Sequence, residues 1–112
     1  MIIYVDIDET ICFYEGERSY PDAVPNHERI AQINKLYDDG NEIVYYTARG
    51  ATSGIDWFDK TKEQLNLWGC KHHRLSVGSK PHYDLLICDK ALNSNDFFAN
   101  PEGSIKGFGS HL

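Results

Sequence analysis

The stretch that most constrains the fold is a short apolar run near the start of the chain that leads directly into two acids. Residues 2–5, Ile-Ile-Tyr-Val, are β-branched, aromatic and apolar, which is typical of a strand buried on both faces. Asp6 and Asp8 follow, and then Glu9 and Thr10. A strand that continued would place both acids on one face. We expect the strand to end instead, with both acids at the carboxyl edge, where open α/β sheets bind ligands.

Asp6 and Asp8 are expected to need a compensating charge. Two carboxylates this close repel each other, so either a proton or a cation should lie between them. Magnesium is the economical choice, because it binds through one or two carboxylates together with the phosphate of a substrate. The alternative is a metal-free acidic turn after a strand.

The next segments predict a loop and then a helix. Residues 11–25 hold Pro21 and Pro25, which exclude a long helix and favour an ordered loop or small hairpin over the acids. Asn26 is typical of a helix cap, and apolar residues then recur at helical spacing until Gly40 ends the helix.

The rest of the chain continues the alternation of strands and helices. Strands are predicted at 42–46, 73–77 and 84–88, with a helix after Asp56 and one further short strand near 105–108. The inward face of that second helix is predicted to carry Trp57, Phe58, Thr61, Leu65 and Trp68. Strands alternating with helices indicate a parallel α/β sheet with right-handed crossovers.

Polar residues follow three of the predicted strands where each one ends. Asp6 and Asp8 follow the first strand, Thr47 the second and Asp89 the fourth, while Lys80 lies in the loop before the fourth. A parallel sheet gathers these carboxyl ends at one edge, so four separate segments are expected to form one pocket.

In sequence order these residues resemble the motifs of the haloacid dehalogenase (HAD) superfamily. Asp6-Ile7-Asp8-Glu9-Thr10 is similar to its first motif, DxDx(T/V), and Thr47, Lys80 and Asp89 resemble the second, third and fourth. The resemblance covers about residues 2–98. It implies a three-layer Rossmann-like fold with a central, mostly parallel sheet. No insertion of cap-domain size is present after the first motif or between the second and third.

The resemblance also implies a mechanism and roles for single residues. Asp6 would attack phosphorus and form an aspartyl-phosphate, and Asp8 would act as acid and then as base. Asp8 would need a proton near neutral pH, which neighbouring carboxylates could favour. The hydroxyl of Thr47 and the charge of Lys80 would bind the phosphoryl group. Asp6, Asp8 and Asp89 would hold Mg²⁺, Asp8 also through its backbone carbonyl.

Three shorter stretches sharpen the resemblance, and one residue departs from it. Thr-Ala-Arg-Gly at 47–50, Asp-Trp-Phe-Asp at 56–59 and Lys-Pro-His-Tyr-Asp-Leu at 80–85 resemble small capsule- or polysaccharide-biosynthesis phosphatases. Arg49 within the first would either bind substrate phosphate or cap the turn. Many members carry two adjacent acids in the fourth motif, whereas this chain has Cys88 before Asp89. If the first acid is the metal ligand of the family, the site here lacks one carboxylate, and Asp84 or Asp96 would supply an outer-sphere acid instead.

Length and charge bound the remaining possibilities. The 112 residues suit one domain, with a core of about 1–98 and a less regular tail at 99–112. A net charge of −6 argues against nucleic-acid partners and anionic membranes. It does not exclude a small phosphorylated substrate, because local cations and a bound metal can override the overall sign. The early first strand leaves no room for a signal peptide, so a cytoplasmic protein is expected. An open site without a cap would accept a large substrate or be covered by a second subunit, which would make the protein a homo-oligomer.

Several functions compete with a sugar-phosphate phosphatase. A nucleotide phosphatase or a phosphotransferase would use the same residues. A phosphoacceptor signalling domain of the receiver type shares the size, the acids, a Thr and a Lys-Pro. Such a domain needs its acceptor Asp at the end of a middle strand, whereas the second strand here ends in Thr47. A HAD-like binding module without catalysis is disfavoured because all five motif residues are present.

Overall fold

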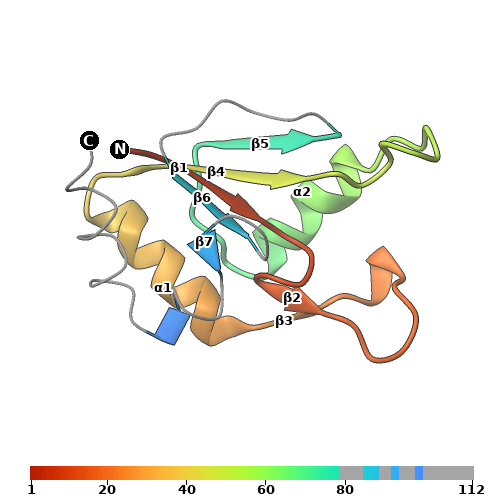
Figure 1. The fold of residues 1–112 in the computed structure, drawn as a ribbon, viewed down its shortest axis with the longest axis horizontal. Coiled ribbons are helices and arrows are strands. Elements are labelled where there is room, and N and C mark those ends of the chain that lie inside the picture. The colour runs from red at the N-terminus through yellow and green to blue at the C-terminus, as the bar shows by residue number, and fades with distance from the viewer. Residues whose placement is uncertain (79–84, 89–91, 94–97, 100–112) are drawn as a thin grey trace.

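The protein is built on one sheet whose described strand pairings are all parallel (Figure 1). The structure, a computed structural model, describes residues 1–78, 85–88, 92–93 and 98–99. In spatial order the strands are β5 (Arg74–Val77), β4 (Glu42–Thr47), β1 (Ile2–Asp6), β6 (Leu85–Cys88) and β7 (Leu92–Asn93). The predicted α/β class and the four predicted strands in the described residues are therefore confirmed. β7 is an addition that the sequence did not predict.

The order of the strands places β1 at the centre of the sheet. From β1 the chain adds β4 and β5 on one side and then β6 and β7 on the other. This is the order of doubly wound Rossmann-like sheets, in which ligands bind outside the carboxyl ends where the direction of winding reverses. That reversal lies between β1 and β6, so the residues that follow β1 stand at the expected ligand site.

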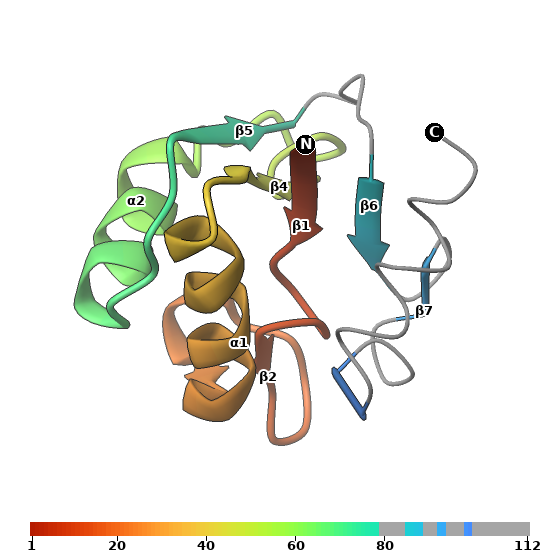
Figure 2. The same cartoon turned by 90° about the vertical axis from the view of Figure 1, so that its left-hand side faces the viewer.

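Two helices connect the first three strands of this sheet. Helix α1 (His27–Asp38) begins where the side chain of Asn26 accepts a hydrogen bond from the backbone N–H of Arg29 at 3.1 Å, as the sequence predicted. Helix α2 (Phe58–Leu67) begins beside Asp56, whose side chain accepts from the N–H of Phe58 at 2.9 Å. Both helices lie on the same side of the sheet (Figures 1 and 2), as expected when two right-handed crossovers run in the same direction.

The core lies between these helices and the sheet. Ile3 and Val5 pair in register with Ile43 and Tyr45, so the four side chains share one face. That face packs in one buried cluster with residues of both helices, Ile30, Ile33 and Leu65. Tyr4 and Val44, on the opposite face, are buried as well. The described residues thus form two layers, and the predicted third layer stays a prediction.

A small hairpin connects β1 to α1. Strands β2 (Cys12–Phe13) and β3 (Val24–Pro25) pair in antiparallel fashion, and a single 3₁₀ turn, η1 (Tyr20–Asp22), lies between them. This confirms the ordered loop or small hairpin expected for residues 11–25. We call the segment between its two strands the 14–23 loop.

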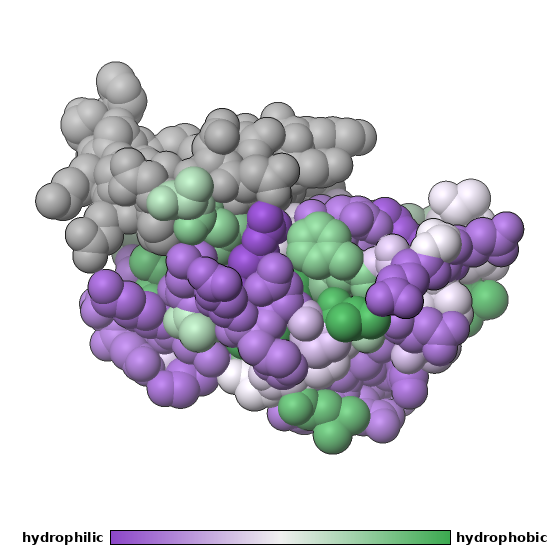
Figure 3. Space-filling view, turned by 90° about the horizontal axis from the view of Figure 1, so that it is seen from below, coloured by the Kyte–Doolittle hydropathy of each residue, from purple (hydrophilic) through white to green (hydrophobic). Residues whose placement is uncertain are grey.

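The predicted inward face of helix α2 is confirmed at Thr61 and Leu65, which are buried, and is wrong at Phe58, which is 42% exposed. Gln64, which was not assigned to that face, is buried as well. Other large apolar residues on the described surface, such as Val24, Ile55 and Leu67, are also exposed, and Figure 3 shows such side chains in separate small groups among hydrophilic ones. Across the described residues, no helix combines the length and apolarity needed to cross a bilayer. The strand predicted at 105–108 lies outside the described residues.

Candidate active site

A tight turn at the end of β1 positions the two predicted acids. The backbone N–H of Ile11 donates to Ile7 O at 3.0 Å, and the N–H of Glu9 donates to Cys12 O at 2.9 Å. Ile7, Ile11 and Cys12 are fully buried, which anchors the turn in the core. Glu9 has a φ of 62°, a left-handed conformation that non-glycine residues adopt rarely and that often occurs at functional sites. The acids are therefore held by the fold and not by a free loop.

The carboxylate of Asp8 accepts hydrogen bonds from four different side chains. Its Oδ1 accepts from Arg49 Nη2 at 2.8 Å, from the hydroxyl of Tyr14, and from Cys12 Sγ at 3.6 Å. Its Oδ2 accepts from Arg49 Nε at 3.1 Å and from Thr47 Oγ1 at 3.2 Å. A carboxylate offers about four lone-pair sites, so these donors occupy it fully. Asp8, Thr47 and Arg49, three of the predicted site residues, are thus in direct contact.

Arg49 uses every donor of its guanidinium inside the protein. Beyond its two bonds to Asp8, Nη2 donates to the hydroxyl of Tyr14 at 3.2 Å. Nη1 donates to Thr61 Oγ1 at 3.2 Å and to Gln64 Oε1 at 2.6 Å. A guanidinium has five N–H groups, and the five bonds account for all of them. The ring of Tyr20 covers its face at 4.6 Å, and the side chain is 0% exposed. We call this group, Arg49 with Asp8, Tyr14, Tyr20, Thr61 and Gln64, the Arg49 cluster.

The charges in this cluster shift the pKa values of its members. Burial alone would raise the pKa of Asp8, but hydrogen bonds from Arg49 and Tyr14 and the charge of Arg49 lower it below its ordinary value. Burial and the neighbouring Asp8 carboxylate raise the pKa of Tyr14, and the same two causes raise that of Cys12 to about 12. The sequence suggested that Asp8 would hold a proton near neutral pH. In this structure that expectation is wrong, because the ion pair with Arg49 keeps Asp8 charged.

Asp6 is the last residue of the central strand and lies beside this cluster in the chain. Its Oδ1 accepts from the backbone N–H of Ile7 at 2.9 Å, and the side chain is half-buried. By strand alternation it points to the face of the sheet opposite to that of Val5. Lys80 and Asp89, the other two predicted site residues, lie outside the described residues.

The turn that carries Arg49 depends on a glycine. Gly50 has a φ of 84°, and a Cβ at this position would lie 2.0 Å from the backbone oxygen of Ile55. Gly54, four residues later, has a φ of 75° and open space around it. The two positions therefore share an unusual backbone conformation but differ in the room available for a side chain.

We expect Gly50→Ala to lower the free energy of unfolding by about 2–4 kcal/mol, because the new methyl group forces the backbone at Ile55 to move. Gly54→Ala is the matched control and is expected to cost only about 1–2 kcal/mol, the price of the left-handed backbone alone. Urea unfolding of both variants measures the difference. Equal losses would mean that the turn relaxes freely around the added methyl group.

Sequence reasoning missed four members of the Arg49 cluster. Tyr14 and Tyr20 stood within the loop expected over the acids, but nothing in their positions indicated contacts with Asp8 or Arg49. Thr61 was assigned to the core face of α2, and Gln64 three residues later was not singled out. A Thr and a Gln at i and i+3 on one helix face, where apolar residues are expected, were the signal that could have indicated a buried polar partner.

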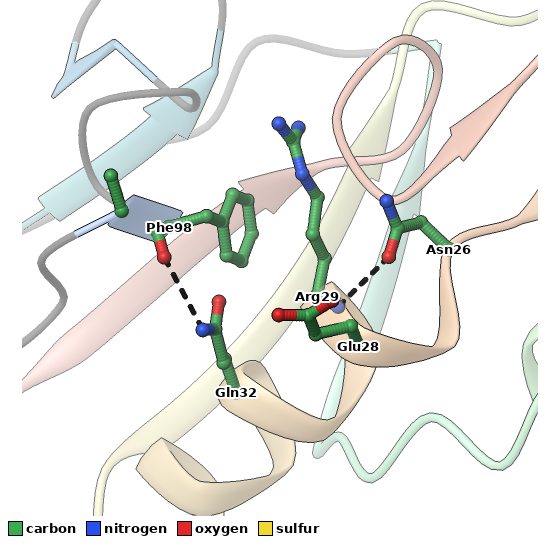
Figure 4. A pocket seen from close by; sticks show the side chains of 6 residues that line it. Asn26, Glu28, Arg29, Gln32 and Phe98 are labelled. Carbon is green, nitrogen blue, oxygen red and sulfur yellow. Dashed lines mark hydrogen bonds between the residues drawn. The ribbon is translucent and has the colours of Figure 1, made fainter.

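A hollow of about 210 Å³ lies at the start of α1, next to Phe98 (Figure 4). The guanidinium of Arg29 lies 5.2 Å from the ring centre of Phe13 and 4.7 Å from that of Phe98. Its Nη1 donates to Thr10 O at 3.0 Å. Gln32 Nε2 donates to Phe98 O at 3.3 Å. Arg29 therefore connects α1 to Thr10, at the end of the turn that carries Asp8.

The described residues fit a magnesium ion in part. The carboxylate of Asp6 and the backbone carbonyl of Asp8 are hard oxygen donors of the kind that Mg²⁺ prefers. The carboxylate of Asp8 fits less well as a direct ligand, because Arg49, Tyr14 and Thr47 occupy it. Within the described ranges no three His, Cys, Asp or Glu residues form a ready metal site. Two ligands plus substrate phosphate and water would still suffice for Mg²⁺.

Comparison with known proteins adds information about the fold. No protein-family model matches the sequence, and no curated protein matches it. The crystal structure of a structural-genomics target from Vibrio cholerae is similar, with a TM-score of 0.74 and 23% sequence identity. The match covers 99% of this chain and 98% of that chain. At this identity the similarity concerns the fold, which the two chains share over almost their whole lengths.

Proposed function

We propose that the protein is a magnesium-dependent phosphatase of the capless HAD type, which hydrolyses a phosphate monoester through an aspartyl-phosphate on Asp6. The observation that carries this proposal is the meeting of Asp8, Thr47 and Arg49 just beyond the ends of β1 and β4. Asp6, two residues before Asp8, is the last residue of β1, and the winding of the sheet reverses between β1 and β6. A carboxylate nucleophile, a second acid and a hydroxyl at this edge are what phosphoryl transfer through a covalent intermediate requires.

In the first half of the reaction a carboxylate oxygen of Asp6 forms a bond to phosphorus while the bond to the leaving oxygen breaks. Mg²⁺, when bound, would stabilise the charge on the phosphoryl oxygens. Lys80 would add a positive charge. Asp8, two residues from the nucleophile, would exchange a proton with the leaving oxygen, which requires one of its bonds to Tyr14 or Thr47 to open first.

In the second half water attacks the phosphorus of the aspartyl-phosphate, gives a proton to Asp8, and inorganic phosphate leaves with the Asp6 carboxylate restored. The lowered pKa of Asp8 suits this step, in which a carboxylate must accept a proton, better than the first step, in which the leaving oxygen must receive one. Leaving groups that depart as stable anions are therefore expected to react faster at neutral pH.

The sheet order helps to separate this function from the signalling alternative. Receiver domains have the strand order 2-1-3-4-5, in which the first strand is not central. Here β1, the first strand, is the central one, and Asp6 is its last residue. This difference favours an enzyme with its nucleophile after the first strand.

Phosphate release with and without Mg²⁺ tests the proposal. We expect p-nitrophenyl phosphate to be hydrolysed faster than sugar phosphates or nucleotides of equal concentration at pH 7, since nitrophenolate needs no proton to leave. EDTA should abolish release from every substrate, and excess Mg²⁺ should restore it. Phosphate release that is unaffected by EDTA would contradict the proposal. A folded protein that releases no phosphate from any of these substrates would contradict it as well.

The substrate class is the finer part of the proposal. A sugar phosphate of polysaccharide biosynthesis follows from the three short stretches that resemble such phosphatases. A nucleotide phosphatase or a phosphotransferase would use the same site, so turnover of nucleotides, and transfer to an added acceptor alcohol, would separate the three.

A further inference from the structure

We propose that Arg49 is a positioning residue that fastens the 14–23 loop to Asp8, so that the loop over the site and the second acid move as one unit. This role differs from both roles that the sequence suggested for Arg49, which were a contact with substrate phosphate and a cap of the turn. It goes beyond the proposed function, on which it rests only for its consequence in catalysis.

The saturation of Arg49 is the first argument. All five N–H groups donate to protein acceptors, and the side chain is 0% exposed. A substrate phosphate could bind this guanidinium only by displacing partners, of which Asp8, Thr61 and Gln64 are themselves buried. The geometry therefore assigns Arg49 to the architecture of the site and not to the substrate.

The contacts of the 14–23 loop are the second argument. The hydroxyl of Tyr14 donates to Asp8 and accepts from Arg49, so one group bridges both partners of the ion pair. Six residues later, the ring of Tyr20 lies on the face of Arg49. The backbone oxygen of Tyr20 accepts from Gln64 Nε2 at 2.6 Å. Both ends of the loop are thus attached to the same guanidinium, directly or through Gln64.

The weakness of the hairpin makes these contacts necessary. Strands β2 and β3 pair over only two residues each, and two short strands are not stable alone. The residues between Tyr14 and Ser19 are exposed. Charge-assisted hydrogen bonds are stronger than neutral ones, and only a planar guanidinium can bind Asp8 twice while reaching two residues of α2. Lysine offers a single point charge and cannot replace this geometry.

The consequence for catalysis follows from the shared oxygen. Tyr14 and Arg49 both donate to Oδ1 of Asp8, so a shift of the loop changes the direction of the acid. If the Asp8 carboxylate points in a different direction, proton transfer slows, whereas the binding of the phosphate group is unchanged. Loosening the loop is therefore expected to lower kcat more than it raises KM.

Hydrogen–deuterium exchange measured by mass spectrometry tests the attachment without any need for turnover. The amides of Asp22 and Ala23 donate to Ser19 O at 2.8 Å and to Tyr20 O at 3.3 Å, so they report on opening of the 14–23 loop. We expect Arg49→Lys to speed their exchange by about tenfold, while amides in the middle of α1 change by less than about twofold. Arg74→Lys is the matched control. Arg74, on β5, makes an exposed ion pair with Glu42 on β4, so this substitution should leave exchange in the loop unchanged.

Tyr14→Phe provides a second variant that keeps the fold if Arg49→Lys does not. It removes only the hydroxyl and should speed the exchange of the loop amides by about threefold. It should also lower kcat, while KM stays within about twofold of the wild-type value. Unchanged loop exchange in folded Arg49→Lys would overturn the proposal, as would equal acceleration in α1. A rise in KM with kcat intact in Tyr14→Phe would overturn the coupling to the acid. If the wild type releases no phosphate, the proposed function fails, and the exchange data still decide whether Arg49 holds the loop.

Discussion

Replacing Arg49 with methionine is expected to lower the free energy of unfolding by about 3–5 kcal/mol. The substitution keeps an apolar stem of similar length, but it removes the cation that pairs with the buried Asp8 carboxylate. Thr61 and Gln64 lose their partner in the same step. Unpaired buried polar groups cost more than the net gain of the bonds they made, so the loss should exceed that of an average core substitution.

A double-mutant cycle separates the ion pair from other effects of the substitution. Asp8→Asn combined with Arg49→Met removes both charges, and the loss in the double variant should be smaller than the sum of the two single losses by more than about 1 kcal/mol. Arg74→Met, at an exposed pair on β5, should cost only about 0–1 kcal/mol. Additive losses in the cycle would contradict a direct coupling of Asp8 and Arg49.

The same variant should change how stability depends on pH. The pKa of Asp8 is lower in the folded chain than its ordinary value of 3.8, so its ion pair adds stability that is fully present above that value and is lost as pH falls below it. Arg49→Met lacks this contribution at every pH. The difference between wild type and variant, measured by urea unfolding in EDTA, should therefore shrink as pH falls from about 5 to about 3. A constant difference would mean that the Asp8 charge does not stabilise the fold.

Replacing Asp6 with asparagine is expected to abolish phosphate release, with a loss in kcat on the order of a thousandfold or more. An amide oxygen does not form the covalent bond to phosphorus that a carboxylate forms. The side-chain oxygen that accepts from Ile7 N at 2.9 Å is retained in asparagine, so the fold should survive.

The control for this variant is a surface acid changed in the same way. Asp38→Asn alters an exposed pair with Lys71 at the end of α1 and should leave turnover intact. Urea unfolding of both variants checks that lost turnover does not reflect lost structure. Full turnover in Asp6→Asn would contradict an aspartyl-phosphate intermediate on this residue.

The fold was predictable because its signals are local and repeated. The buried run at 2–5, the cap at Asn26 and the Gly40 stop each mark an element boundary, and the alternation of elements then determines the parallel sheet. The carboxyl-edge position of Asp6, Asp8 and Thr47 followed from the order of the elements alone.

The charge state of Asp8 and the role of Arg49 could not be predicted in the same way. Both depend on which side chains from residues 14–64 meet, and on how deeply they are buried. Arg49 looked equally suited to a substrate and to a turn, because the sequence contains no sign of its burial. Phe58 was assigned to the inward face because it is apolar, but it is exposed. Gln64, which was not singled out, is buried because it is a polar partner of Arg49.

The amide of Gln64 carries a constraint that reaches beyond this one helix. Its oxygen accepts from Arg49 and its nitrogen donates to Tyr20 O, so neither end can be exchanged for the other. Without an arginine at position 49, a buried glutamine and threonine on α2 would only cost stability. Positions 49, 61 and 64 therefore form one unit of evolutionary variation: a lineage that replaces the arginine gains from making both α2 positions apolar, and a lineage that keeps it must keep all three.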